Sequence, residues 1–160
     1  MNQQHTAIHE AGHAVIARVL GMACGQATVK PDCDLGEAGH AIIHDQWATW
    51  GQWEDRRKYR EIHTVVQGRI ISSMAGAEAE REILGYCAGG DGDDRDQIEM
   101  MASSSDSGIE PEAWPRWELR MRRQCRRLVR KHRSKIIRVA AALECETTLL
   151  AKQIDELVAE

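Results

Sequence analysis

A run of five residues near the start of the chain combines two imidazoles with a carboxylate: His9-Glu10-Ala11-Gly12-His13. The i,i+4 spacing places both imidazoles on one face of a helix, one above the other, which suits two ligands of a zinc ion. Glu10 lies one residue round the helix from His9, so its carboxylate can contact water at the metal without being a ligand. The run therefore predicts a zinc site in which Glu10 is the general base for the attack of water on a carbonyl group.

Gly12 stands in the middle of this predicted helix. Glycine at such a position costs about 1 kcal/mol relative to alanine. We therefore expect another backbone, or a ligand, to approach closely at Gly12. The alternative interpretation is that His9 and His13 are surface histidines on an ordinary helix.

A third ligand must come from another part of the chain, because a catalytic zinc site takes three protein ligands and keeps one position for water. Acidic residues between positions 78 and 96 are the candidates. A glutamate on a second helix and an aspartate at a helix start are both workable, so residue chemistry leaves the choice open. The candidates are Glu78, Glu80, Glu82, Asp91, Asp93, Asp94 and Asp96.

The hydrophobic periodicity predicts the elements that carry these side chains. Helices are expected over 4–20, from Glu54 to Leu84 with a bend or close packing at Gly76, from Asp93 or Asp94 onward, over 117–143, and from Thr147 or Thr148 to the end. Short strands are expected at 26–30 and 39–44, and a flexible connection at 103–115. The predicted class is mostly α with a small β-sheet: a zincin-like H-E-x-x-H helix plus a C-terminal helical bundle.

The composition narrows the function and the compartment. The net charge is −4, and residues 116–138 hold eleven Lys and Arg against one acid, Glu118. We interpret this segment as a helix face that docks on an acidic neighbour, since no nucleic-acid motif accompanies it; a polyanion-binding module is the alternative. Five Cys without a C-x-x-C pair, no export signal and no long apolar stretch predict a cytoplasmic protein without a membrane partner.

Three separated segments share motifs with one enzyme family. They are Ala7–Ala14 (A-I-H-E-A-G-H-A), Gly76–Gly85 (G-A-E-A-E-R-E-I-L-G) and Gly89–Ile98 (G-G-D-G-D-D-R-D-Q-I), and the tail adds His132-Arg133 and Leu143–Leu149. Together they resemble the peptidase domain of the FtsH-type ATP-dependent zinc proteases, in which the segments read A-x-H-E-A-G-H-A, G-x-x-A-E-x-x-x-x-G and T-G-A-x-x-D-x-x-x-A. The resemblance extends over nearly the whole chain.

The resemblance implies roles for two of the candidate acids. It maps the family's third zinc ligand onto Asp94, and it places Glu80 beside the site as a partner of the ligands. Gly89-Gly90-Asp91 stands where the family has T-G-A, so a small shift would move the ligand to Asp93 or Asp96. The strand at 39–44 corresponds to the edge strand along which the family's substrates lie.

The sequence also departs from the family. It contains no P-loop, no AAA+ ATPase module and no membrane helix, so we expect activity without ATP. Residues 1–160 are expected to form a single zinc metallopeptidase domain, with a catalytic half at 1–102 and a C-terminal helical part at 116–160.

The main hypothesis is thus a zinc-dependent endopeptidase that hydrolyses peptides or unfolded proteins through a metal-activated water. The alternative is a zinc-retaining binding or regulatory protein with little turnover, working with a separate ATPase. A homo-oligomer is compatible with either hypothesis.

Overall fold

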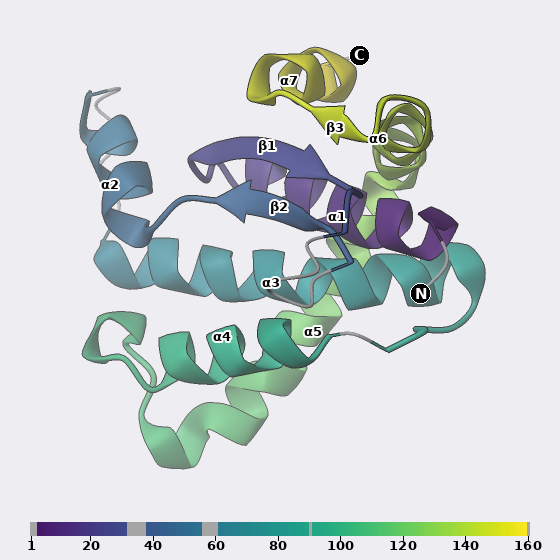
Figure 1. Ribbon diagram of the computed structural model, residues 1–160. Helices are drawn as coiled ribbons and strands as arrows, with labels where there is room; N and C mark the ends of the chain where they lie inside the picture. Colours follow the sequence, from purple (N-terminus) through teal and green to yellow (C-terminus); the bar gives the residue numbers. More distant parts are fainter. Residues whose placement is uncertain (1–2, 32–37, 56–60, 90, 160) are drawn as a thin grey trace.

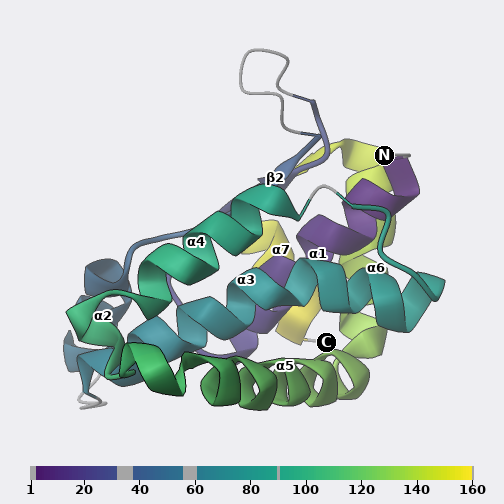
Figure 2. The same ribbon diagram turned by 90° about the horizontal axis from the view of Figure 1, so that it is seen from below.

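The computed structural model describes residues 3–31, 38–55, 61–89 and 91–159 (Figures 1 and 2). The class is mostly α with a small antiparallel sheet, which confirms the sequence-based prediction. The helices are α1 (Gln3–Val19), α2 (Gln46–Asp55), α3 (Ile62–Leu84), α4 (Gly92–Ala102), α5 (Trp114–Lys131), α6 (Arg133–Glu146) and α7 (Ala151–Ala159). The strands are β1 (Cys24–Thr28), β2 (His40–Ile43) and β3 (Thr148–Leu149), and two 3-10 helices, η1 (Ser105–Ser107) and η2 (Pro111–Ala113), lie between α4 and α5.

Helix α1 is the centre of the structure. Every residue from His5 to Ala17 is buried, because α1 packs against α3, α6 and the sheet. A Cβ added at Gly12 would lie 2.7 Å from the Ala75 carbonyl oxygen and 2.8 Å from the Ala79 Cβ. The close approach expected at Gly12 is therefore that of the α3 backbone.

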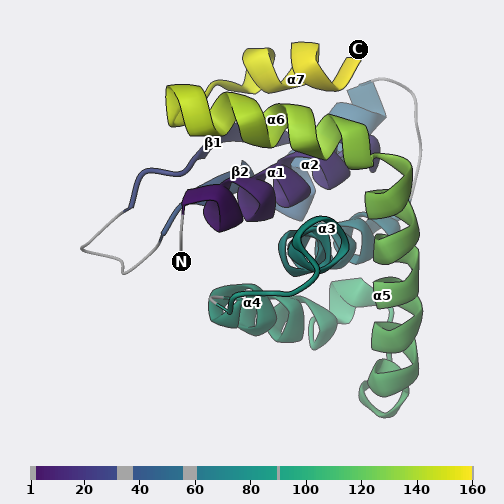
Figure 3. The same ribbon diagram turned by 90° about the vertical axis from the view of Figure 1, so that its right-hand side faces the viewer.

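Helix α3 lies between α1 and α4, and Figure 3 shows it nearly end-on between those two helices. It runs without interruption through Gly76, and of the bend or close packing expected there, the close packing is present. The long helix expected from Glu54 begins instead at Ile62; residues 56–60 lie outside the described residues. Helix α3 ends at Leu84 and is capped by Gly85, whose positive φ of 88° is a conformation that glycine adopts without strain.

The sheet has the order β2-β1-β3, with antiparallel pairing throughout. In the centre, Ala27 of β1 pairs with Ala41 of β2 on one side and Leu149 of β3 on the other. Strand β2 is an edge strand, as expected for residues 39–44. Strand β3 lies where the final helix was expected to begin, and that helix, α7, begins at Ala151 instead. Two residues carry no readable alternation, so the sequence does not indicate this strand.

Helix α2 is also missing from the sequence-based expectations. The Asp45 carboxylate accepts hydrogen bonds from the backbone N–H groups of Trp47 and Ala48, which caps the start of this helix. Trp53 is buried, and its indole N–H donates to the Gly21 carbonyl, 2.8 Å away. Trp47 is exposed and stacks edge-on against Trp50 at 6.2 Å between ring centroids.

The long basic helix expected over 117–143 is two helices, α5 and α6, which meet at a corner at His132 (Figure 3). The apolar face of α5 packs against α3, whereas α6 packs against α1, so one straight helix cannot serve both. The basic side of α5 docks on α3: Arg126 donates to Glu78 at 2.7 Å, and Arg130 donates to Glu82 at 2.8 Å. For the part of residues 116–138 that lies on α5, this agrees with the interpretation of a helix face that docks on an acidic neighbour.

Among the described helices, none combines the length and the apolar composition needed to cross a bilayer. Cys24, Cys87, Cys125 and Cys145 are free thiols. Cys125 is fully buried on the face of α5 that contacts α3, and burial raises the pKa of its thiol to about 12. This thiol therefore belongs to the packing of the core.

Candidate metal centre

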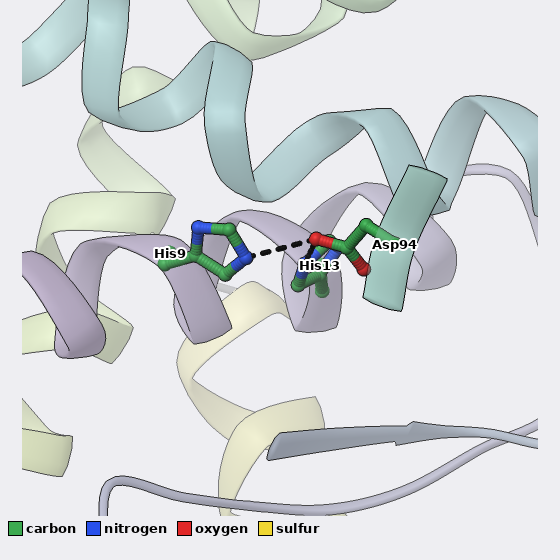
Figure 4. Close-up of side chains that lie close together, drawn as sticks. All are labelled: His9, His13 and Asp94. Carbon is green, nitrogen blue, oxygen red and sulfur yellow. Dashed lines mark hydrogen bonds and ion pairs between the residues drawn. The ribbon is translucent and has the colours of Figure 1, made fainter. Parts of the chain in front are cut away.

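Two histidines of α1 and one aspartate of α4 point toward one another (Figure 4). The Asp94 Oδ2 atom lies 3.0 Å from the His9 Nε2 atom and 3.2 Å from the His13 Nε2 atom. The three ligand-type atoms lie within 4.8 Å of one another. Residues 85 positions apart in the sequence thus supply one compact set of two imidazoles and a carboxylate.

The opposite nitrogen of each imidazole is held by an acceptor. The His13 Nδ1 atom donates to the Ser72 carbonyl oxygen at 2.7 Å, and the His9 Nδ1 atom donates to the Glu80 Oε1 atom at 2.6 Å. Both acceptors require a proton on Nδ1, so in each neutral imidazole the lone pair is on Nε2. The two lone pairs then face Asp94, which is the orientation that metal-binding histidines have.

Gly76 of α3 lies against the two imidazoles and leaves space at their Nε2 atoms. A Cβ added there would lie 2.5 Å from the His9 Nε2 atom and would collide with the His13 Nε2 atom as well. Any side chain at position 76 would therefore occupy the space at the two Nε2 atoms. Glycine is required here by the close approach of a helix to two rings.

The donor set fits a zinc ion. Two imidazole nitrogens and one carboxylate oxygen form a ligand set found in catalytic zinc sites, which retain a position for water. Zinc–ligand distances of about 2.0–2.1 Å in tetrahedral geometry separate neighbouring ligand atoms by about 3.3 Å. The 3.0 and 3.2 Å separations around Asp94 are close to this value.

The other acids considered as third ligands lie elsewhere. Glu80 is beside the site, but it contacts the His9 ring at Nδ1, on the side away from Asp94. The remaining candidates either pair with arginines or point to solvent. Glu78 pairs with Arg126 and Glu82 with Arg130, Asp91 pairs with Arg95, and Asp93 and Asp96 are exposed.

The charged groups of the site shift one another's pKa values. Burial lowers the pKa of His9, but the hydrogen bonds to Asp94 and Glu80 outweigh burial and raise that pKa to about 10. Burial also opposes the charge on His13, yet Asp94 raises the pKa of that imidazole. For Asp94, burial raises the pKa, while His13 and His9 together hold it well below its usual range. Asp94 is therefore an anion between two imidazoles that attract protons in the absence of metal.

Glu10 is buried next to His9 on α1, with 7 % of its surface exposed. Burial raises the pKa of its carboxyl group above the ordinary value, and the charges of His13 and His9 only partly oppose this. The imidazole of His40, at the start of β2, acts in the same direction as these charges. A carboxylate with a raised pKa is suited to accepting a proton near neutral pH.

Two further residues, His5 and Tyr86, lie beside the site and are not among the residues expected there. His5 lies one helical turn before His9 and is bonded to Glu80, and Tyr86 follows the end of α3 and contacts His5. The spacing of His5, His9 and His13 at i, i+4 and i+8 was a signal for the first of them. Tyr86 carries no such signal, because its position depends on the loop after α3.

Comparison with known proteins gives no family for this chain. No protein-family model matches it, and no curated protein is significantly similar to it. The function is therefore inferred from the geometry of the site.

Proposed function

We propose that this protein is a zinc-dependent endopeptidase that hydrolyses peptides or unfolded proteins without ATP. One observation carries the proposal: His9, His13 and Asp94 converge with their metal-binding atoms facing inward, and Glu10 is buried beside them. The acceptors at both Nδ1 atoms support this function, because a pair of surface histidines would have no need of them.

His9, His13 and Asp94 would hold the zinc ion. A bound zinc ion supplies Lewis acidity, which lowers the pKa of water and polarises a carbonyl group. Glu10 is not part of this ligand set, so its carboxylate remains available for proton transfer. It would accept the proton of the attacking water and return that proton to the nitrogen of the departing amine.

The shape of the substrate follows from the edge strand. Strand β2 pairs only with β1 among the described strands, and its first residue, His40, lies close enough to Glu10 to affect the pKa of that carboxyl group. An extended peptide could pair with the outer edge of β2 and run past the ligands. A folded protein cannot supply such a segment, so we propose unfolded proteins and peptides as substrates.

We further propose that the chain is a divergent relative of the FtsH-type peptidases. The segments that carry the resemblance lie on three different elements, namely α1, α3 and the start of α4, and all three contribute residues to the site. The free thiols of the described cysteines are in keeping with the cytoplasm, which we propose as the compartment.

Metal content followed by turnover tests the proposal. Protein reconstituted with zinc and dialysed should retain about one ion per chain, as a three-ligand site requires. It should degrade casein without ATP, lose this activity with a chelator and regain it with added zinc. If no zinc is retained, the proposal is wrong; if zinc is retained but no unfolded substrate is cleaved, the binding or regulatory protein replaces it.

A further inference from the structure

The carboxylate of Glu80 joins three parts of the structure. It lies on α3 with no exposed surface, and its Oε1 atom accepts from the His9 Nδ1 atom of α1 at 2.6 Å. Its Oε2 atom accepts from the His5 Nδ1 atom, one turn earlier on α1, at 2.9 Å. The same oxygen accepts from the backbone N–H of Ala88, in the loop after α3, at 2.8 Å.

The ionised state of Glu80 determines the direction of the hydrogen bonds to its two oxygens. An ionised carboxylate only accepts, so His9 and His5 both donate to Glu80 from Nδ1. A neutral His5 then has its lone pair on Nε2, which lies 3.0 Å from the Tyr86 hydroxyl. In that tautomer Tyr86 donates to His5, and the rings of these two residues are in contact at 4.8 Å between centroids.

The position of Glu80 depends on these donors. Because its two oxygens face different partners, the hydrogen bonds at Oε2 set the rotation of the carboxylate and so direct Oε1 at His9. Without His5, Oε2 would keep one donor, Ala88, and the carboxylate could rotate away from the His9 ring. A partly satisfied buried carboxylate is also costly, so its surroundings would rearrange.

We propose that His5 is a positioning residue for the metal centre, which acts by holding Glu80 so that the Nε2 atom of His9 faces the zinc ion. This inference rests on the proposed metal site. Through Tyr86 and Ala88, the same hydrogen bonds also hold the first residues after α3.

Two isosteric substitutions test this role. In His5→Asn, the amide nitrogen can take the place of Nδ1 and keep the donor to Glu80. In His5→Gln, the amide nitrogen takes the place of Nε2, so the group reaches Tyr86 and the donor to Glu80 is lost. Both variants are neutral and polar, and His63→Gln, at a partly exposed histidine at the start of α3, is the matched control.

The measurement is zinc affinity, obtained by titrating metal-free protein against a chelator of known affinity, with circular dichroism to show that each variant is folded. We expect His5→Gln to bind zinc about tenfold more weakly than the wild type, near the lower limit for partners of metal ligands. His5→Asn and His63→Gln should stay within about threefold of the wild type, a range that does not reach that limit. The absorption of Co²⁺ in the site should change in His5→Gln and not in His5→Asn.

The outcomes separate the two proposals. If the wild type binds zinc and His5→Gln binds it equally well, His5 has no positioning role, while the proposed peptidase stands. If His5→Asn and His5→Gln weaken zinc binding to the same extent, or neither folds, the role of His5 is that of a packing residue and the inference is wrong. If the wild type binds no zinc, the proposed function is wrong, and the inference about His5 is wrong with it.

Discussion

Asp94 and Glu80 contact opposite nitrogens of the same imidazole: Asp94 lies 3.0 Å from the His9 Nε2 atom, and Glu80 lies 2.6 Å from the His9 Nδ1 atom. The two carboxylates therefore have different roles. Glu80 selects the tautomer of His9, whereas Asp94 shares the space at which His9 and His13 converge. Asp94 is the carboxylate placed to become a metal ligand.

The different positions of these two acids predict different effects on metal binding. Asp94→Ala should lose stoichiometric zinc, because only two imidazoles would remain, and His9→Ala or His13→Ala should do the same. Glu80→Gln should retain zinc but bind it about 10–100-fold more weakly, as expected for a partner of a ligand. Zinc per chain and chelator competition measure both effects, with the exposed Glu99→Gln on α4 as the control. Loss of zinc in Glu80→Gln but not in Asp94→Ala would exchange the two roles.

Glu10 should affect turnover without affecting metal content. Its carboxylate is buried beside the ligands, and its raised pKa suits a general base. Glu10→Gln should retain zinc and the fold but cleave an unstructured peptide about 10²–10⁴-fold more slowly, the usual contribution of a positioned base. The rate of cleavage at equal zinc occupancy is the measurement. Equal rates in wild type and variant would remove the catalytic role of Glu10.

Gly76 should be required for the site. In Gly76→Ala the new methyl group would meet the Nε2 atoms of His9 and His13, so zinc binding should be lost. The overpacking should also destabilise the fold by about 1–3 kcal/mol. Gly51→Ala on α2 is the matched control, since nothing lies within 4 Å of its added Cβ. That control should stabilise the protein by about 0.5–1 kcal/mol. Urea unfolding of both variants, combined with zinc analysis, measures these effects.

Zinc and protons should compete for the site. Without metal, the pKa of His9 is raised to about 10, so at pH 7 this ring carries a proton that zinc must displace. Zinc affinity should therefore rise about tenfold per pH unit for each proton released between pH 7 and 9. Calorimetry in two buffers with different ionisation enthalpies counts these protons. An affinity that does not change with pH would show that both imidazoles are already neutral.

The stability of the metal-free protein should fall as the pH rises, whereas zinc affinity should rise. The pKa of His9 is higher in the folded state than the ordinary value of 6.5, so folding is favoured by proton binding. This stabilisation is fully present below pH 6.5 and is lost as the pH rises toward 10. Melting temperatures of metal-free protein at pH 6.5 and 9.5 should differ accordingly, and His9→Gln should reduce the difference.

The local part of the site follows from the sequence. The spacing of His9 and His13 on a helix requires only the α-helical repeat, so the shared direction of the two rings can be predicted without tertiary information. The same holds for the position of Glu10 and for the close approach at Gly12, which the α3 backbone accounts for. The position of His5 on the same helix face can also be predicted from the sequence, because His5 precedes His9 by four residues.

Which acid lies between the two imidazoles could be decided only by the tertiary structure. Glu80 and Asp94 are both far from His9 in sequence, and both lie within hydrogen-bonding distance of it in space. Which nitrogen each acid reaches depends on how α3 and α4 pack against α1. The resemblance to a known family indicated Asp94, but periodicity and spacing left seven acids open.

Tertiary packing likewise decided where the C-terminal helices divide. Residues 117–143 have one continuous helical pattern, because the apolar faces of α5 and α6 have the same period. The chain turns at His132 because the two faces pack against different partners, α3 and α1. Local helix propensity depends on neighbours in the sequence. It therefore determines that α1 is a helix and that His9 and His13 share one face of it. The meeting of His9 with Asp94 depends on burying those helices against one another, and only the folded chain specifies it.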